Sequence, residues 1–355
     1  MTLMRISWAL LALVLSAAAA GGAEKPAPPD INQSVSFPSG VAVQRDLVYA
    51  TIEGFRPLTL DLYQPASKAK EPPRPAILYI HGGGWVSGDA RHLKGFDDFP
   101  STLAGLAAKG MVVVAVNYRL AGEAHFPAAV QDVKSALRWL RGHATDYNID
   151  TTRVMIWGVE AGGQIASLAG TSCGVTTLEP AADAASKAPL ASDCVQGVID
   201  WAGPSDFASW DADAGRGAEA AAATHLGAYL GCEPADCAPG VVRGASPLTY
   251  VGAQTPPFFI QQGAEDKFAA SAQSHKLYDA LRAQRVPADI RIYADVGQDF
   301  AKDGTPDPAT GVQALADMQD FIAKTFPPPP EPEASEKPAK KSAKPAKGKT
   351  TKAHK

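Results

Sequence analysis

The chain has 355 residues, which is long enough for one large domain with unstructured ends. Of these residues 46% are hydrophobic and 20% charged, as is ordinary for a soluble globular protein. Its formal net charge is −4. Eight lysines against three glutamates give residues 331–355 a charge of +5, which leaves −9 for the rest of the chain. The negative net charge of residues 1–330 argues against a nucleic-acid-binding domain.

The N-terminus has the pattern of an export signal. Arg5 is followed by an apolar run from Ile6 to about Ala20 and then by small residues up to Ala23. That order is typical of a secretory signal peptide, and the run is shorter than the roughly 20 apolar residues that a membrane-spanning helix needs. We therefore predict a signal peptide over residues 1–23, cleaved after Ala20 or Ala23, and a secreted or periplasmic protein.

Polar, proline-containing segments flank the central part of the chain. Residues 24–37 are predicted to be a linker. Residues 327–355 open with four prolines, continue in Lys-Pro-Ala units and contain almost nothing apolar, so we predict a disordered basic tail. Such a tail could hold the protein against anionic material of the cell envelope, although a solvated tail is the simpler interpretation.

Between these segments, strand-like runs alternate with helix-like runs. Residues 76–80 and 112–117 are short and continuously apolar, as expected of strands buried on both faces. Residues 47–52 and 58–63, which come earlier in the chain, are predicted to form an antiparallel pair of strands. The remaining predicted strands are residues 154–157, 197–201, 258–261 and 290–293.

Helical periodicity fills most of the gaps between these strands. In residues 127–141 the apolar side chains fall on one helical face, with Pro127 in the first turn, and residues 311–324 form the last predicted helix. The alternation predicts one α/β domain over residues 38–326. Its fold is a doubly wound, mostly parallel sheet with helices on both faces.

Four cysteines fit an oxidising compartment. Of the three possible pairings, the simplest joins each cysteine to its neighbour along the chain. Zinc is the weaker alternative, because no Cys-x-x-Cys and no cluster of histidines accompanies the cysteines, so we predict no metal and no cofactor. The predicted disulfides are Cys173–Cys194 and Cys232–Cys237.

Two glycine-rich turns follow predicted strands. Residues 81–85 (HGGGW) come directly after the strand that ends at residue 80, and their glycines let backbone N–H groups face a ligand. Residues 158–163 (GVEAGG) join the strand 154–157 to a helix that begins near Ala161. A sharp Gly-x-nucleophile-x-Gly turn has this context, and Glu160 stands at its apex.

Together with residues 117–120 (NYRL), 123–132 (EAHFPAAVQD) and 245–248 (ASPL), these turns resemble the hormone-sensitive-lipase-like esterases. They are most similar to the bacterial branch related to feruloyl esterases. The resemblance covers residues 45–325 and implies an α/β-hydrolase fold with carboxylesterase activity. It also implies that backbone donors in the oxyanion hole come from Gly83, Gly84 and Ala161.

The same resemblance places a catalytic triad at positions 160, 266 and 298. Asp266 matches the family's acid. Glu160 stands where the family has serine, and Gln298 stands where it has histidine. An amide does not titrate, and no other histidine follows the last predicted strand within the domain, so the chain lacks a base at the family's position.

These substitutions favour a catalytically inactive protein that keeps its pocket. We expect the Glu160 carboxylate to accept hydrogen bonds from the glycine loop and from the Ala161 N–H, which would block the oxyanion hole. One alternative is an active hydrolase in which Glu160 acts as a carboxylate nucleophile. A second is an envelope protein that acts through its basic tail. The pocket could bind a small ester-like or aromatic acid ligand, and Glu160, Asp266 and Asp299 could together bind a cation. The oligomeric state stays open.

Overall fold

The computed structural model describes residues 34–66, 71–180, 191–213 and 220–327. One sheet contains strands β1 to β9, and a short hairpin contains β10 and β11. The strands are β1 (Ser34–Ser36), β2 (Val41–Ala50), β3 (Leu58–Pro65), β4 (Arg74–Ile80), β5 (Val112–Val116), β6 (Ile149–Val159), β7 (Gly197–Trp201), β8 (Phe258–Gly263), β9 (Ala288–Tyr293), β10 (Ala301–Lys302) and β11 (Thr305–Pro306).

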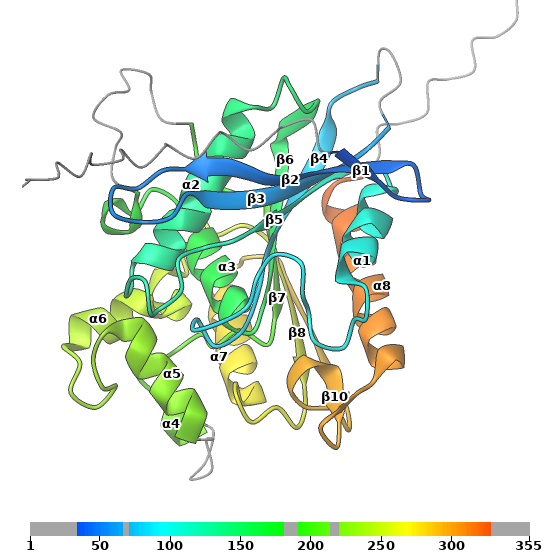
Figure 1. The fold of residues 1–355 in the computed structure, drawn as a ribbon. Coiled ribbons are helices and arrows are strands. Elements are labelled where there is room, and N and C mark those ends of the chain that lie inside the picture. Colours follow the sequence, from blue (N-terminus) through cyan, green and yellow to red (C-terminus); the bar gives the residue numbers. More distant parts are fainter. Residues whose placement is uncertain (1–33, 67–70, 181–190, 214–219, 328–355) are drawn as a thin grey trace, which may run out of the picture.

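The large sheet has the strand order β1-β2-β3-β5-β4-β6-β7-β8-β9 (Figure 1). Strands β1, β2 and β3 pair antiparallel with their neighbours, and every pair from β5 to β9 is parallel. The carboxyl ends of the parallel strands therefore share one edge, where an open α/β sheet presents its ligand-binding loops.

All eight strands expected from the sequence are present, and most extend beyond the predicted bounds. One correction concerns the segment predicted as a linker, residues 24–37, because β1 lies inside it and pairs with β2 through Val35 and Val43. A three-residue strand without an apolar run has no hydrophobic pattern that predicts it from the sequence. It forms because it pairs with β2. The predicted signal peptide and residues 328–355 of the predicted tail lie outside the described residues.

Helices cover both faces of the sheet. Figure 1 places α1 (Phe99–Ala107) and α8 (Pro308–Thr325) on one face, while α2 (Ala128–Gly142), α3 (Ala161–Thr171) and α7 (Ser271–Ala283) cover the other. Successive side chains of β4 point to opposite faces of the sheet. Ile77 and Tyr79 pack in the core under α1 and α8. Leu78 and Ile80 pack in the core under α2 and α3. The doubly wound α/β fold is confirmed.

The remaining helices lie mostly between β7 and β8. They are α4 (Trp210–Asp213), α5 (Ala220–Leu230), α6 (Pro239–Ala245) and the 3₁₀ turn η2 (Pro247–Tyr250), with further 3₁₀ turns η1 (Thr176–Leu178) and η3 (Gln298–Phe300) elsewhere. Along the described ranges, no helix combines the length and the apolar composition that crossing a bilayer requires.

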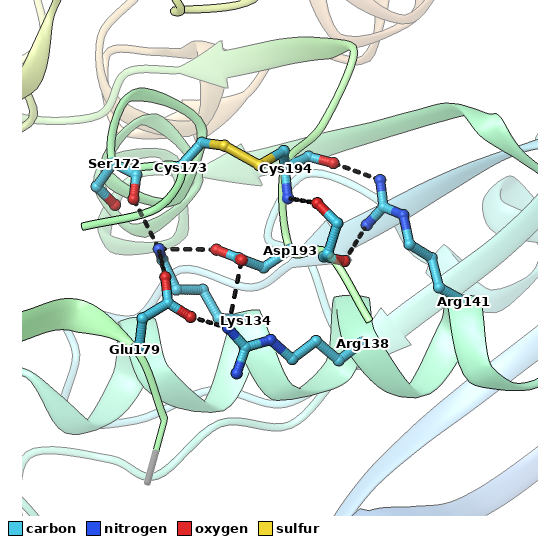
Figure 2. The surroundings of a disulfide bond; sticks show 9 residues. Lys134, Arg138, Arg141, Ser172, Cys173, Glu179, Asp193 and Cys194 are labelled. Carbon is cyan, nitrogen blue, oxygen red and sulfur yellow. Dashed lines mark hydrogen bonds and ion pairs between the residues drawn. A yellow bond between two sulfur atoms is a disulfide. The ribbon is translucent and has the colours of Figure 1, made fainter. Parts of the chain in front are cut away.

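Both predicted disulfides are present, Cys173–Cys194 and Cys232–Cys237. Figure 2 shows that the first lies beside a buried ion network on α2. Lys134, fully buried, donates to the Ser172 carbonyl at 2.8 Å and pairs with Asp193 at 2.8 Å and Glu179 at 3.1 Å. Because Ser172 and Asp193 flank the two cysteines, the disulfide and the ion network fix the same segment.

This network predicts a large cost for removing its central cation. Lys134→Ala should lower the free energy of unfolding by about 3 kcal/mol, since buried carboxylates lose a partner. Urea denaturation measures the change. Lys324 is the matched control: its side chain is 74% exposed and pairs with Asp289 at 3.1 Å, so Lys324→Ala should cost less than about 1 kcal/mol. Equal losses in the two variants would contradict the buried network.

Candidate functional site

The glycine loop leaves β4 and is fixed by a buried tryptophan. Trp85 stacks on the ring of Tyr229 at 4.8 Å between centroids, and its indole N–H donates to Gln164 Oε1 at 2.9 Å. Gly83 (φ 97°) and Gly84 (φ 58°) adopt backbone angles that side chains disfavour. These angles expose the backbone N–H groups of the loop at the carboxyl edge of the sheet.

The second turn, between β6 and α3, is as sharp as the sequence predicts. Glu160 sits at its apex with φ 57° and ψ −116°, and its N–H donates to the Trp201 carbonyl at 2.7 Å. A Cβ on Gly158 would lie 2.0 Å from the Gly162 carbonyl oxygen, and one on Gly162 would lie 2.2 Å from the Ile80 carbonyl oxygen. The turn therefore requires glycine on both sides of Glu160.

Both oxygens of the Glu160 carboxylate have close donors. Oε2 accepts from the Gly83 N–H at 2.8 Å, and Oε1 accepts from the Gln298 side-chain amide at 2.6 Å. The expected contact with the glycine loop is thus present. Among the described residues, however, no hydrogen bond links the Ala161 N–H to this carboxylate. Glu160 is only 8% exposed, so its carboxylate fills the space beneath the loop.

Asp266 follows β8 and is held by its own loop. Its Oδ1 accepts from the N–H groups of Phe268 at 2.8 Å and Ala269 at 3.0 Å, while its Oδ2 is buried and has no hydrogen-bond partner in the described chain. The structure therefore brings Glu160 and Gln298 into contact, but it does not join Gln298 to Asp266 by a hydrogen bond between described residues.

Burial dominates the electrostatics of the site. Burial raises the pKa of Glu160 to about 7. The hydrogen bond from the Gly83 N–H lowers this pKa, and repulsion from Asp299 and Asp266 raises it further. Burial also raises the pKa of Asp266 to about 7 and raises that of Asp299, which faces Lys94 at 3.7 Å. The three carboxyl groups thus interact, but the described residues contain no group of three or more His, Cys, Asp or Glu that could hold a metal ion.

A cleft of about 400 Å³ opens in front of Glu160. One wall carries His225, which comes from α5. The imidazole lies directly against the glycine loop, because a Cβ on Gly84 would be 2.3 Å from His225 Nδ1. The side chains and loop residues that line the cleft include Gly83, Gly84, Glu160, Gln298, Asp299, His81, His92, Lys94, His225 and Phe268.

His225 adds a histidine to the cleft, away from the position at which the resemblance places the base. No histidine occupies the base position at 298, but three histidines line the cleft. Sequence reasoning missed His225 because no motif marks α5 and nothing local indicates that this helix folds back over the glycine loop. Only the tertiary contact with Gly84 identifies the residue.

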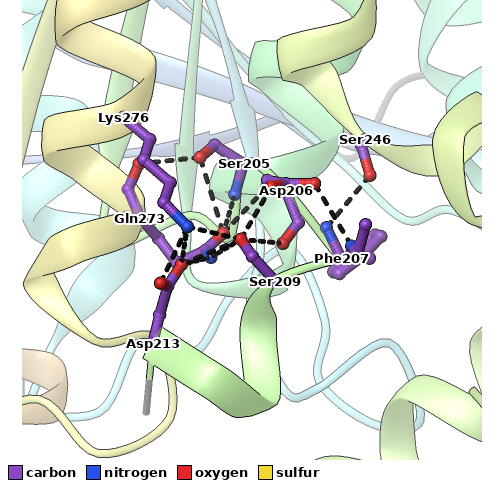
Figure 3. Close-up of polar contacts among 9 residues, drawn as sticks. Ser205, Asp206, Phe207, Ser209, Asp213, Ser246, Gln273 and Lys276 are labelled. Atoms are coloured by element: carbon purple, nitrogen blue, oxygen red, sulfur yellow. Dashed lines mark hydrogen bonds and ion pairs between the residues drawn. The ribbon is translucent and has the colours of Figure 1, made fainter.

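The segment that carries α4 and α5 is anchored to α7 by the polar network in Figure 3. Gln273, fully buried, accepts from the backbone N–H groups of Ser205 at 2.9 Å and Asp206 at 2.7 Å. Lys276 pairs with Asp213 Oδ1 at 2.7 Å. These contacts fix the start of the segment that leads to His225.

The pKa of Glu160 predicts how stability depends on pH. A folded pKa of about 7, above the usual 4.5, means that the folded protein keeps a proton that the unfolded chain loses first. The stabilisation is complete below about pH 4.5 and disappears as the pH rises through about 7. Glu160→Gln should therefore flatten the fall in free energy of unfolding between about pH 5 and pH 8, by up to about 3 kcal/mol.

Urea denaturation at the two pH values tests this expectation. Glu53→Gln is the control, because Glu53 is exposed and lies outside the cleft, so its pH dependence should match that of the unchanged protein. An unchanged pH dependence in Glu160→Gln would show that Glu160 titrates as a solvated carboxyl group.

Several known esterases are similar to this chain in sequence. Esterase LipQ of Mycobacterium tuberculosis is 28% identical over 229 residues, which cover 64% of this chain and 51% of LipQ. Arylacetamide deacetylase of Oryctolagus cuniculus is 40% identical over 122 residues, which cover 34% of this chain and 30% of that enzyme. The alignment with a second esterase of that bacterium, LipC, covers 49% of LipC. The chain therefore spans about half the length of these two mycobacterial esterases.

Solved structures extend the likeness to most of the fold. A truncated carbohydrate esterase from gut microbiota superposes with a TM-score of 0.64 at 25% identity, covering 82% of this chain and 98% of its own. A bifunctional GH43-CE protein of Bacteroides eggerthii gives a TM-score of 0.60 at 29% identity, covering 80% and 38%. The family model BD-FAE matches residues 60–281. The chain therefore belongs to the BD-FAE family, within the esterase-type α/β-hydrolases.

Proposed function

We propose that this carboxylesterase-like protein is an exported pseudoenzyme that has lost acyl transfer and uses its cleft to bind a ligand. One observation carries the proposal: the side chain at the nucleophile position occupies the donor of the glycine loop, with Glu160 Oε2 2.8 Å from the Gly83 N–H. In an acyl-transfer enzyme that donor stabilises the negative oxygen of the tetrahedral intermediate.

The base position supports the same conclusion. A serine hydrolase needs a hydroxyl nucleophile and a group that accepts its proton near neutral pH. Gln298 does not titrate, and its amide N–H already donates to Glu160 at 2.6 Å. In another hydrolase, loss of either the serine or the histidine lowers the rate on the order of a million-fold.

The cleft keeps the features of a ligand site. It combines apolar side chains such as Phe268 with backbone and side-chain donors, which suits a small ester-like or aromatic acid compound. Two disulfides are typical of an oxidising compartment, and with the predicted signal peptide they favour a secreted or periplasmic protein. Contact of the Lys-rich tail with anionic envelope material would add a second attachment.

A second candidate function has one observation in its favour. If Glu160 were a carboxylate nucleophile, the acyl-enzyme anhydride that it forms would need a base to activate water, and His225 lines the same cleft. The geometry opposes this candidate, because Glu160 cannot attack a carbonyl carbon and at the same time hold the Gly83 N–H that the new oxyanion would need.

Hydrolysis of p-nitrophenyl acetate separates the two candidates. The unchanged protein should cleave the ester no faster than a Glu160→Ala variant. The double variant Glu160→Ser with Gln298→His should gain activity, at least about tenfold over Glu160→Ser alone, because only the pair restores nucleophile and base. Asp299, beside the restored base, should limit the gain.

Turnover by the unchanged protein that disappears in both Glu160→Gln and His225→Ala would establish the carboxylate mechanism and refute the pseudoenzyme. The His275→Ala variant is the control for the second change, since His275 is exposed on α7 and lies outside the cleft.

A further inference from the structure

We infer that two copies of this chain pair through β9, the last strand of the large sheet, in one antiparallel register. The strand order ends at β9, so one side of this strand has no neighbouring strand within the described residues. A strand in that position presents backbone N–H and C=O groups that another chain can bind. No residue of β9 lines the cleft, and the inference goes beyond the proposed function.

The hydrogen bonds of β9 fix which of its backbone groups face outward. The carbonyl groups of Pro287, directly before the strand, and of Tyr293, its last residue, both accept from residues of β8 at 2.9 Å. Every second residue between these two also faces β8, since backbone groups alternate between the two sides of a strand. The remaining residues, Ala288, Ile290 and Ile292, therefore direct their N–H and C=O groups away from the sheet. No hydrogen bond between described residues uses these outward groups.

One antiparallel register uses all of these groups and also places opposite charges together. With Ile290 of one copy opposite Ile290 of the other, Ala288 lies opposite Ile292, and every outward N–H meets a C=O. The same register places Asp289 of one copy opposite Arg291 of the other, at the close spacing of a pair without backbone hydrogen bonds. Sliding one strand by two residues sets Asp289 against Asp289 or Arg291 against Arg291, and the like charges oppose both shifts.

Helix α8 extends this charge complementarity. Within one copy, Asp289 pairs with Lys324 at 3.1 Å, and Arg291 pairs with Asp317 at 3.1 Å. Pairing of two copies aligns these side chains in a row of alternating sign: Lys324, Asp289, Arg291 and Asp317. Asp289 is 56% exposed and Arg291 is 55% exposed, so both can reach a second copy. Charges on an edge strand usually prevent pairing, but here their signs are complementary between two copies.

The other face of β9 adds apolar contacts. Ile290 packs against the core under α2 and α3 and stays partly exposed, as does Ile292. Two copies joined through these residues form one continuous sheet. Because the strands run antiparallel across the contact, the carboxyl edges of the two sheets, and with them the two clefts, lie at opposite ends of the pair. The dimer thus presents two ligand sites that face in opposite directions.

Sedimentation velocity of the full chain at about 1 to about 100 μM tests the pairing, because a dimer dissociates on dilution. The unchanged protein should show an equilibrium of monomer and dimer. Asp289→Lys and Arg291→Glu should each weaken dimerisation by about tenfold or more, since each variant places like charges opposite one another twice in the dimer. An equimolar mixture of the two variants should recover the dimer, because the new lysine of one variant faces the new glutamate of the other.

Two further variants separate the backbone contact from a general effect of charge. Ile290→Pro removes an outward N–H and leaves the hydrogen bonds to β8 in place, so it should abolish the dimer in a folded protein. Glu53→Lys is the matched control for the change at position 289, because Glu53 is exposed and lies between β2 and β3, away from β9. This control should dimerise as the unchanged protein does. Circular dichroism checks that each variant is folded.

Several results would overturn the inference: a monomer at every concentration, an undiminished dimer in either charge variant or in folded Ile290→Pro, or a mixture of the charge variants that stays monomeric. Growth beyond the dimer would also overturn it, since pairing through one edge strand about a two-fold axis closes on two copies. Hydrolysis of p-nitrophenyl acetate does not depend on this interface, so the proposed function stands or fails separately.

Discussion

The hydrogen bond between the Gly83 N–H and Glu160 Oε2 decides what this site can do. It joins two turns that the sheet brings together, because β4 and β6 are parallel neighbours and their carboxyl ends meet at one edge. Glycines at 158 and 162 allow the close approach, since a Cβ at either position would clash with a carbonyl oxygen. The fold thus presents a donor for a negatively charged oxygen, and a side chain of the same protein supplies that oxygen.

Asp266 lies apart from the contact between Glu160 and Gln298. Its loop still holds one oxygen with two backbone N–H groups, while the other oxygen is buried without a partner in the described chain. In the family's pattern, a histidine at position 298 would face this acid. With glutamine there, the amide donates to Glu160, and burial raises the pKa of Asp266 to about 7. If Asp266 is the acid that the resemblance predicts, it lacks the histidine that such an acid orients.

The sequence was sufficient for most of the fold and for the centre of the site. Continuous apolar runs marked β4 and β5, and the glycines around Glu160 marked the turn, because these patterns are local and each has one physical explanation. It was not sufficient for β1, whose pairing depends on β2, or for His225, whose place depends on how α5 folds back over Gly84. The missing hydrogen bond between Asp266 and Gln298 also depends on side-chain geometry that residue types do not specify.

The most direct measurement of the central claim is the amide signal of Gly83 in a pH titration by NMR, with glycine labelled selectively with ¹⁵N. If Glu160 accepts from this N–H, the Gly83 signal should shift with a midpoint near pH 7, and the shift should disappear in Glu160→Gln. Gly110, which lies far from the cleft after α1, provides a reference signal within the same sample. A Gly83 signal that stays constant from about pH 5 to about pH 9 while the protein remains folded would contradict the claim that Glu160 occupies the donor of the glycine loop.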